Sequence, residues 1–314
     1  MIIKKFPEDF VVEEIPIKFS GKGDYSIYRL EKKDYTTESA VEYLCKKFKI
    51  PRKNIKYAGT KDRHAITIQY ISILRDTRNL KLNTDNIKID FVSFHNEPLS
   101  LGSLQGNHFK IKIRELSVEE IKFFEKNFIN DFVFPNYFDD QRFSENNLEI
   151  GFSILKKDFK KACELIGLEV KNNNYVSALK SIPQKNLLFY IHAVQAFVFN
   201  KELSELIIKK DNHYLRKYRH GQLAFLEDKN YDEFPKMLKL VGFDSENKIL
   251  NDLGLTSKDF IIKQFSELSV ESVERECFVG TNLSYKKHNQ YNEIDLEFSL
   301  PKGSYATMLI KALF

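Results

Sequence analysis

Strand patterns lie at both ends of this 314-residue chain, and helical patterns lie between them. Near the start, Phe10 and Val12 and then Ile15 and Ile17 alternate with other residues, and near the end Ile294–Leu300 alternates strictly. Such alternation indicates strands with one buried face. A chain that begins and ends in strands, with helices between, is typical of an α+β domain into which a second domain is inserted.

The helical patterns are amphipathic and carry N-terminal signals. Asp34–Ile50 is predicted as a helix with Thr36 or Thr37 as its N-cap, and Ser117 with Glu120 forms a capping box that begins another. Further helical segments are predicted over Asp158–Ile166, Leu187–Lys209, Tyr231–Val241 and Ser257–Phe265. The apolar run at 187–199 contains a histidine and a glutamine and is too short to span a membrane, so we expect a buried helix.

Composition and residue spacing argue against a disulfide-stabilised protein, a metal-binding protein and a secreted protein. The net charge of +5 and the pI near 8.8 suit a polyanionic partner without demanding one. Cys45, Cys163 and Cys277 lie far apart, and the seven histidines lack metal-ligand spacing, so neither a disulfide framework nor a metal site is predicted. The charged N-terminus has no signal-peptide pattern, and we expect a cytoplasmic protein.

The most informative stretch is Tyr57–Gln69, in which Lys61, Asp62, Arg63 and His64 follow a small Ala-Gly pair and precede a strand pattern. An aspartate between two cations is kept ionised, because opposite charges and hydrogen-bond donors favour its charged form. Such a carboxylate can act as a nucleophile or a base. An ordinary charged surface loop is the commoner interpretation. An acid/base pair of Asp62 with His64 is disfavoured, since no oxyanion-hole motif or triad partner accompanies it.

Two further segments permit contact with RNA. Phe134–Ser144 gathers aromatic side chains in a polar loop, which indicates either core packing or a platform for base stacking. Leu215–Gly221, with Arg216 and Arg219, is the densest basic stretch, and a charged surface turn is as plausible there as phosphate contact.

Six segments together, in the same order along the chain, resemble the TruD family of tRNA pseudouridine synthases. They are F-P-E-D-F-V-V-E-E, A-G-T-K-D-R-H-A, L-S-L-G-S-L-Q-G-N-H-F, N-Y-F-D-D-Q-R-F-S, H-A-V-Q-A-F-V-F-N and L-P-K-G-S-Y-A-T. They run from the first residues to residue 307, so the resemblance covers essentially the whole chain.

The resemblance implies a fold and a reaction. The fold is α+β: a pseudouridine-synthase catalytic domain with a largely antiparallel sheet (1–149 and 271–314), interrupted by an inserted, mostly helical α/β TRUD domain (150–270). The function implied is conversion of a flipped-out uridine of tRNA, at position 13 in bacterial relatives, to pseudouridine. The partner would be tRNA, with no cofactor, metal or membrane, and a monomer is expected.

The resemblance also assigns residues. Asp62 would be the catalytic aspartate, Lys4 a cation beside it, and Asn136 and Phe138 the lining of the base pocket. The remaining candidates for substrate binding are Arg63, Glu14, Arg216 and Arg219. The chain has Asp139 and Ser144 where the family usually has glycine, which puts the geometry of that loop in question. The alternative function is a non-catalytic tRNA-binding or tRNA-chaperone protein on the same fold.

Overall fold

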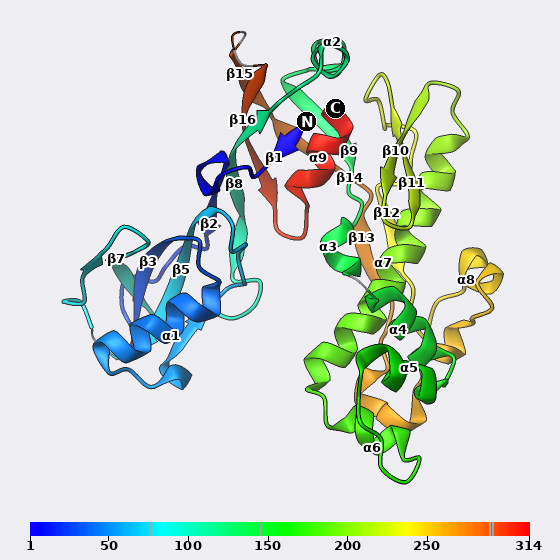
Figure 1. Cartoon of the computed structure of the whole chain (residues 1–314), viewed down its shortest axis with the longest axis horizontal. Helices are drawn as coiled ribbons and strands as arrows, with labels where there is room; N and C mark the ends of the chain where they lie inside the picture. The colour runs from blue at the N-terminus through cyan, green and yellow to red at the C-terminus, as the bar shows by residue number, and fades with distance from the viewer. Residues whose placement is uncertain (76, 145, 289, 291) are drawn as a thin grey trace. The chain divides into compact units, whose positions relative to one another are not determined.

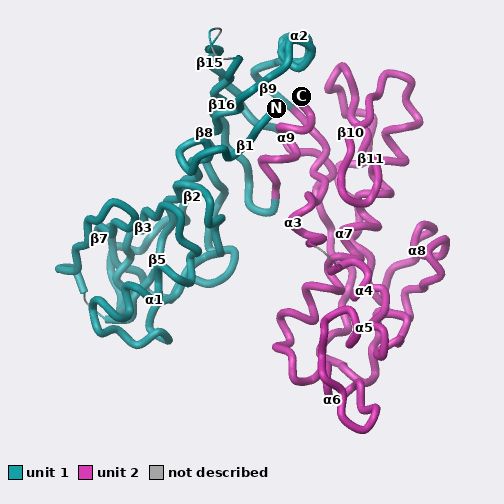
Figure 2. Tube along the Cα trace, viewed as in Figure 1, with its two compact units in different colours: residues 1–132, 280–303, 314 teal, residues 133–279, 304–313 magenta. Residues whose placement is uncertain are grey.

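The computed structural model describes residues 1–75, 77–144, 146–288, 290 and 292–314, which divide into two compact units (Figures 1 and 2). The first unit holds 1–132, 280–303 and 314, and the second holds 133–279 and 304–313. The chain enters the second unit within β9 (Asp131–Pro135) and returns within β14 (Phe278–Asn282). These units are defined by compactness, and the domain boundaries given above remain a prediction.

The first unit is built on one ten-stranded sheet. Its order is β15 (Ser284–His288), β16 (Glu293–Pro301), β8 (Leu104–Arg114), β2 (Phe10–Pro16), β5 (Ile66–Leu74), β3 (Tyr25–Lys33), β7 (Ile87–His95) and β6 (Leu82–Asn83). β1 (Ile2–Ile3) pairs with β8, and β4 (Ile55–Tyr57) pairs with β5. The described pairs of this sheet are antiparallel except β2–β5, which is parallel, so the predicted largely antiparallel α+β fold is confirmed.

Two helices of the first unit begin at the predicted caps. In α1 (Thr37–Phe48), Thr36 accepts a hydrogen bond from the Ser39 amide, and α2 (Val118–Asn127) begins at the capping box of Ser117 with Glu120. The buried stripe of α1 is Ala40, Val41 and Leu44, and it packs in one hydrophobic cluster with side chains of β3, β5 and β7. This packing holds α1 against β3, β5 and β7, and the loop that carries Asp62 leads into β5.

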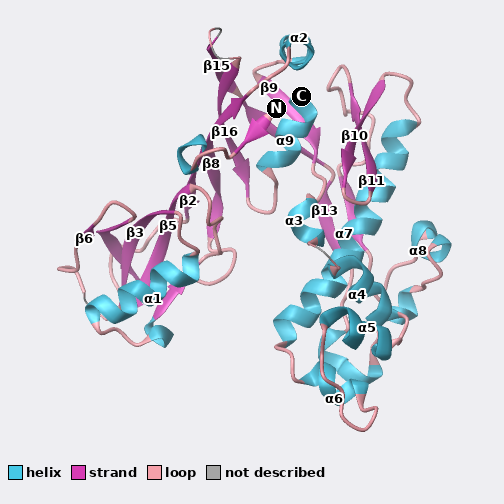
Figure 3. Cartoon of the chain, viewed as in Figure 1, coloured by secondary structure: helices cyan, strands magenta, loops and turns pink. Residues whose placement is uncertain are grey.

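The second unit is organised around the long helix α7 (Gln184–Ile208), as Figure 3 shows. The other helices are α3 (Asp140–Phe143), α4 (Asn147–Leu155), α5 (Phe159–Ile166), α6 (Tyr175–Lys180), α8 (Lys248–Asp252) and α9 (Ala306–Leu313). Two strand pairs accompany them: β10 (His213–Tyr218) with β11 (Gly221–Leu226), and β12 (Met237–Leu240) with β13 (Val273–Glu276). α4 crosses α7 at Gly151, where a Cβ would lie 2.2 Å from the Tyr190 carbonyl oxygen.

Two predictions of local structure need correction. The helix predicted over Tyr231–Val241 is wrong, because β12 forms there and pairs with β13, whose residues lie too far along the chain for a local pattern to reveal. The segment predicted as a helix at Ser257–Phe265 instead contains 3-10 turns at Ser257–Phe260 and Lys263–Leu268. Among the described residues, none of the helices is both long and apolar enough to cross a membrane.

Candidate active site

Asp62 and Lys4, predicted as a pair, lie together in the first unit. Asp62 is in the loop between β4 and β5, and its Oδ2 lies 2.5 Å from the Lys4 Nζ. The same ammonium lies 4.0 Å from the centre of the Phe10 ring, a cation–π contact. The Asp62 side chain is 38% exposed, so the carboxylate is paired yet open to a ligand.

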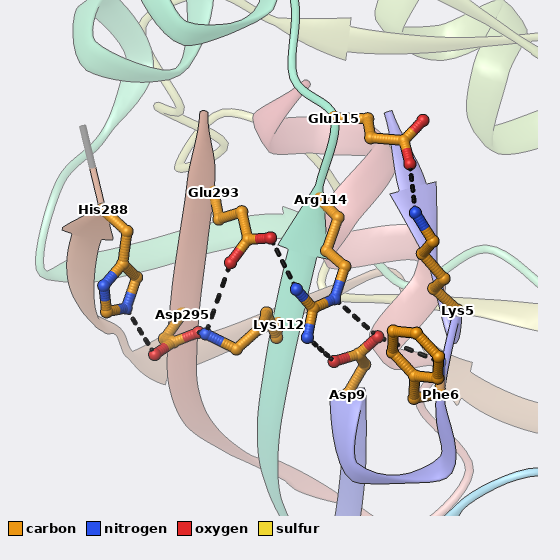
Figure 4. A network of polar contacts seen from close by, with 9 residues as sticks. All are labelled: Lys5, Phe6, Asp9, Lys112, Arg114, Glu115, His288, Glu293 and Asp295. Carbon is orange, nitrogen blue, oxygen red and sulfur yellow. Dashed lines mark hydrogen bonds and ion pairs between the residues drawn. The ribbon is translucent and has the colours of Figure 1, made fainter. Parts of the chain in front are cut away.

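Asp9, a few residues after Lys4 along the chain, forms an ion pair with Arg114 (Figure 4). Asp9 is buried and accepts hydrogen bonds of 2.9 and 2.7 Å from the fork of Arg114 on β8, which also donates to Glu293 at 2.5 Å. Burial would raise the pKa of the Asp9 carboxyl, but the hydrogen bonds from Arg114 and from the Phe6 amide, together with the positive charges of Arg114 and Lys112, outweigh burial and lower that pKa. A bidentate pair of this kind fixes orientation as well as distance, so it anchors the segment that carries Lys4.

The backbone of the loop that carries Asp62 accepts a hydrogen bond from a buried lysine. Lys32, at the end of β3, is 0% exposed, and its Nζ donates to the carbonyl oxygens of Asp62 at 2.7 Å and of Tyr35 at 2.6 Å. Burial lowers the pKa of Lys32 to about 8, although the charge of Asp62 opposes that shift. Sequence reasoning missed Lys32, because it follows Glu31 in a stretch that resembles an exposed strand end.

Two neutral side chains complete the support of this loop. The Lys61 amide donates to Thr37 Oγ1 at 2.9 Å, and the Thr37 hydroxyl donates to Gln69 Oε1 at 2.9 Å. Gln69 Nε2 in turn donates to the Gly59 carbonyl at 3.1 Å. Thr37 and Gln69 are both buried, so the backbone of the loop is fixed at residues 59, 61 and 62 by groups that do not touch the Asp62 carboxylate.

The remaining candidates of the first unit have different places. Glu14 is buried on β2 with its Oε2 3.1 Å from Lys61 Nζ, and burial raises the pKa of its carboxyl against the effect of Lys61. Arg63 is exposed beside Asp62. His64 Nδ1 lies 3.0 Å from Asp34 Oδ1, so the acid/base pair of Asp62 with His64 has no support in this geometry. No metal-binding cluster of His, Cys, Asp or Glu occurs among the residues described.

In the second unit, Asn136 and Phe138 share one partner, Arg275 of β13. Its guanidinium donates to the Asn136 carbonyl oxygen at 2.9 Å and to Oδ1 at 2.9 Å, and its central carbon lies 3.9 Å from the centre of the Phe138 ring. The side-chain Nδ2 of Asn136 also donates to the Glu276 carbonyl oxygen at 3.1 Å. Burial lowers the pKa of Arg275 to about 10. The sequence prediction missed this arginine, which is far from the motif along the chain.

Phe138 is held by its backbone and by its ring. The side chain of the buried Asn200 of α7 accepts a hydrogen bond from the backbone amide of Phe138 and donates one to the Phe138 carbonyl oxygen, each at 2.8 Å. Its ring meets Phe199 and Tyr305 edge-on, with centroids 5.7 and 6.1 Å apart. Phe138 is only 6% exposed, so any ligand meets part of the ring.

The two departures from the family pattern have local explanations. Asp139 is buried, and its carboxylate accepts hydrogen bonds from the Thr307 hydroxyl and, at 2.9 Å, from Lys311 Nζ, so its charge is paired. Ser144 has φ 41°, a conformation that favours glycine, and its carbonyl accepts a hydrogen bond from Arg219. The loop therefore keeps a positive φ at residue 144 without the glycine.

Arg216 and Arg219 belong to the β10–β11 hairpin of the second unit. Arg216 Nε donates to the Lys311 carbonyl at 3.1 Å, and the guanidinium stacks 4.7 Å from the Tyr214 ring centre. The Arg219 amide donates to Asp140 Oδ1 at 2.9 Å. Both side chains thus contact the protein itself, and their contact with phosphate stays a prediction.

Comparison with known proteins agrees with this architecture. The sequence model of the family "tRNA pseudouridine synthase D (TruD)" matches residues 1–173 and 236–313. The chain is 31% identical to the tRNA pseudouridine synthase D of Sulfurimonas denitrificans (99% of this chain, 94% of the relative) and 30% identical to that of Leptospira interrogans serovar Lai (99% and 95%). A crystal structure of a TruD from Methanosarcina mazei superimposes with a TM-score of 0.69 at 22% identity, covering 99% of this chain and 92% of the other. The chain therefore belongs to the TruD family of tRNA pseudouridine synthases.

Proposed function

We propose that this protein converts a uridine of tRNA to pseudouridine, with Asp62 as the catalytic carboxylate. The observation that carries the proposal is the setting of Asp62: a partly exposed carboxylate paired with Lys4, in a loop whose backbone is fixed by buried side chains. The position proposed for the target is uridine 13, and the protein would act in the cytoplasm.

The reaction needs a carboxylate and correct placement, and it consumes no co-reactant. The N1–C1′ bond of the uridine breaks, the base turns, a C5–C1′ bond forms, and the proton on C5 is exchanged for one on N1. Asp62 would either attack C1′ or remove a proton from C2′, and a carboxylate can serve both routes. Lys4 would keep Asp62 ionised and oriented, because its ammonium is 2.5 Å away.

The second unit would hold the target base once it has left the helical stack. Flipping a nucleotide costs a few kcal/mol, which contact with an aromatic ring partly offsets. Phe138 would supply that contact. The Asn136 side chain is engaged by Arg275 and by the Glu276 carbonyl, which favours a role in holding the loop over a direct contact with the uracil edge.

Pseudouridine mapping tests the proposal directly. Carbodiimide treatment and primer extension of tRNA from cells with and without the gene should show loss of one site, restored by the wild type and not by an Asp62→Asn protein. The non-catalytic tRNA-binding alternative predicts tight binding, an unchanged map and indifference to Asp62. Loss of a site other than 13 would reject only the proposed position.

Phe138 provides a second test. We expect Phe138→Leu, which keeps an apolar side chain but removes the π-face, to lower turnover about tenfold or more while tRNA affinity changes much less, since stacking on a base contributes on this scale. Single-turnover rates and filter binding would measure the two quantities. Phe152→Leu, a half-buried phenylalanine of α4, is the matched control. Equal turnover in both variants would remove Phe138 from base handling.

The basic hairpin can be tested through salt dependence. We expect the double replacement of Arg216 and Arg219 by Ala to reduce the slope of log affinity against log salt by about one to two, because each lost phosphate contact removes close to one unit. Lys160 and Lys161 of α5, replaced together, control for the loss of two charges elsewhere in this unit. Slopes equal to that of the wild type would mean that the hairpin does not touch RNA.

A further inference from the structure

We infer that a strip of unpaired lysines on the first unit binds phosphate groups of the tRNA close to the target nucleotide. This rests on the proposed function. The strip begins at the end of α1 and continues to β4, directly before the loop that carries Asp62. Its members all have exposed side chains, and they are Lys46, Lys47, Lys49, Lys53 and Lys56.

The excess positive charge of the chain is concentrated in this segment. Residues 43–61 contain six lysines, one arginine and no acidic residue. The whole chain has 49 lysines and arginines against 44 acidic residues, so the remainder has 42 against 44 and is slightly acidic. The charge that would attract a polyanion therefore lies within these 19 residues.

The lysines of the strip differ from other lysines of the first unit in having no acidic partner. None of them makes an ion pair or an ammonium hydrogen bond with any residue that the structure describes. Elsewhere in this unit, lysines lie within ion-pair distance of a carboxylate, as Lys112 does with Asp295 in Figure 4; they are Lys5, Lys33, Lys88, Lys110, Lys112 and Lys287. Neighbouring like charges without partners repel one another, and a bound polyanion relieves that repulsion.

The fold extends the strip along the whole length of α1. After the last turn of the helix the chain turns back, because Arg52 donates to both carboxylate oxygens of Glu38 in the first turn, at 2.6 and 2.7 Å. The Tyr57 hydroxyl donates to the same carboxylate at 2.9 Å. Lys56, the neighbour of Tyr57, is thus near the start of α1, and the strip covers about 18 Å, the length of a helix of 12 residues.

The same turn of the chain joins the strip to the proposed catalytic loop. The Lys61 amide in that loop donates to Thr37, the first residue of α1, at 2.9 Å. The strip and the loop are therefore both held by the first turn of one helix, within one compact unit. Because every nucleotide carries a phosphate, a tRNA that presents a ribose to Asp62 brings neighbouring phosphates of the same strand to these ammonium groups.

Lysine is suited to contact with phosphate. Its ammonium is a compact point charge on a flexible stem, without the rigid fork by which arginine recognises a base edge. Contacts of this kind position a nucleic acid and carry no sequence information. The arginine of the segment, Arg52, is occupied by Glu38 and by the Ile55 carbonyl oxygen at 2.8 Å, so it supports the fold of the strip. The contact should therefore be independent of RNA sequence and weaken as salt rises.

The test compares two variants that each lose four lysine charges from the first unit. The strip variant carries Lys46→Gln, Lys47→Gln, Lys53→Gln and Lys56→Gln, and it keeps Lys49, whose φ of 54° ends α1. The control variant carries substitutions of paired lysines, which are Lys88→Gln, Lys110→Gln, Lys112→Gln and Lys287→Gln. Filter binding at several salt concentrations measures affinity for tRNA and for an RNA duplex of similar size and unrelated sequence. Steady-state assays with tRNA measure kcat and KM.

For the strip variant, we expect the slope of log affinity against log salt to fall by about three on both RNAs, since each lost phosphate contact removes about 0.7 to 0.9. KM for tRNA should rise about tenfold or more. The kcat at saturating tRNA should stay within about twofold of the wild type, because the strip does not touch the Asp62 carboxylate, and this value also shows that the variant is folded. The control variant should keep the slope of the wild type.

The inference is overturned if the slope for the strip variant stays within about one of the wild type, or if the control variant loses as much. A fall confined to tRNA, with an unchanged slope for the unrelated duplex, would also contradict a contact with phosphate. Absence of turnover by the wild type would reject the proposed function, whereas the salt slopes would still decide the inference.

Discussion

Asp62→Asn is expected to lower pseudouridine formation by about 10⁴-fold or more, the scale on which loss of an essential reacting carboxylate is felt. The amide has nearly the shape of the carboxylate and still accepts a hydrogen bond from Lys4. The loop should stay in place, because Lys32, Thr37 and Gln69 hold its backbone and none of them bonds to the replaced carboxylate. Affinity for tRNA should therefore stay within about threefold of the wild type.

Single-turnover assays and filter binding with the same tRNA separate these two effects. Asp34→Asn is the matched control: it removes a nearby exposed carboxylate, whose partner is His64, and it should leave turnover unchanged. Asp34 has φ 58°, which asparagine tolerates. Turnover by Asp62→Asn above about one per cent of the wild type would reject Asp62 as the essential group.

Lys32→Met is expected to lower kcat about 10²-fold, the loss that accompanies displacement of a reacting group by about an ångström. Methionine fills a similar volume, but it cannot donate to the carbonyl oxygens of Asp62 and Tyr35. Because Lys32 is buried and donates to backbone carbonyls of the protein, KM for tRNA should change little. Lys33→Met is the matched control, since Lys33 is the next residue, is only half-buried and pairs with Glu8. A kcat of Lys32→Met within threefold of the control would show that the loop does not need this clamp.

Stability against pH provides a second readout on the same variant. The pKa of Lys32 is lowered from 10.5 to about 8 in the folded protein. Below about pH 8 the Lys32 amine is protonated in both the folded and the unfolded protein. Between about pH 8 and 10.5 it is protonated only in the unfolded protein. The free energy of unfolding of the wild type relative to Lys32→Met should therefore rise across this interval, by up to about 3 kcal/mol. Denaturant unfolding at pH 7.5, 9 and 10 measures it, and a constant difference would contradict the buried ammonium.

The parts of the site that sequence analysis found depend on local patterns. The loop that carries Asp62, the N-cap Thr36 and the capping box at Ser117 are each specified by residues a few positions apart, and the structure has them where the patterns indicated. The expected pairing of Lys4 with Asp62 came from the family resemblance, since nothing local joins residues so far apart. Short-range pattern is thus sufficient for these helix starts and for the loop that carries Asp62.

The supporting residues could not be found in this way. Lys32, Gln69 and Arg275 acquire their roles only when the fold brings distant backbone or side-chain groups to them. A lysine or glutamine in a strand pattern is normally placed on the exposed face, and the burial of Lys32 is visible only after β3 is paired on both sides. The same long-range pairing explains why β12 was mistaken for a helix.

The position of β2 in the sheet has a consequence for folding during synthesis of the chain. Val12 pairs with Thr67 on one side and with Phe109 on the other, and Asp9 is anchored by Arg114. During translation this N-terminal segment leaves the ribosome long before any of those partners. Until they emerge, the backbone N–H and C=O groups of β2 have no strand to pair with. We expect Lys4 to meet Asp62 only after residue 114 has emerged. Nascent chains would then pass through an inactive, aggregation-prone stage during which chaperone protection matters most.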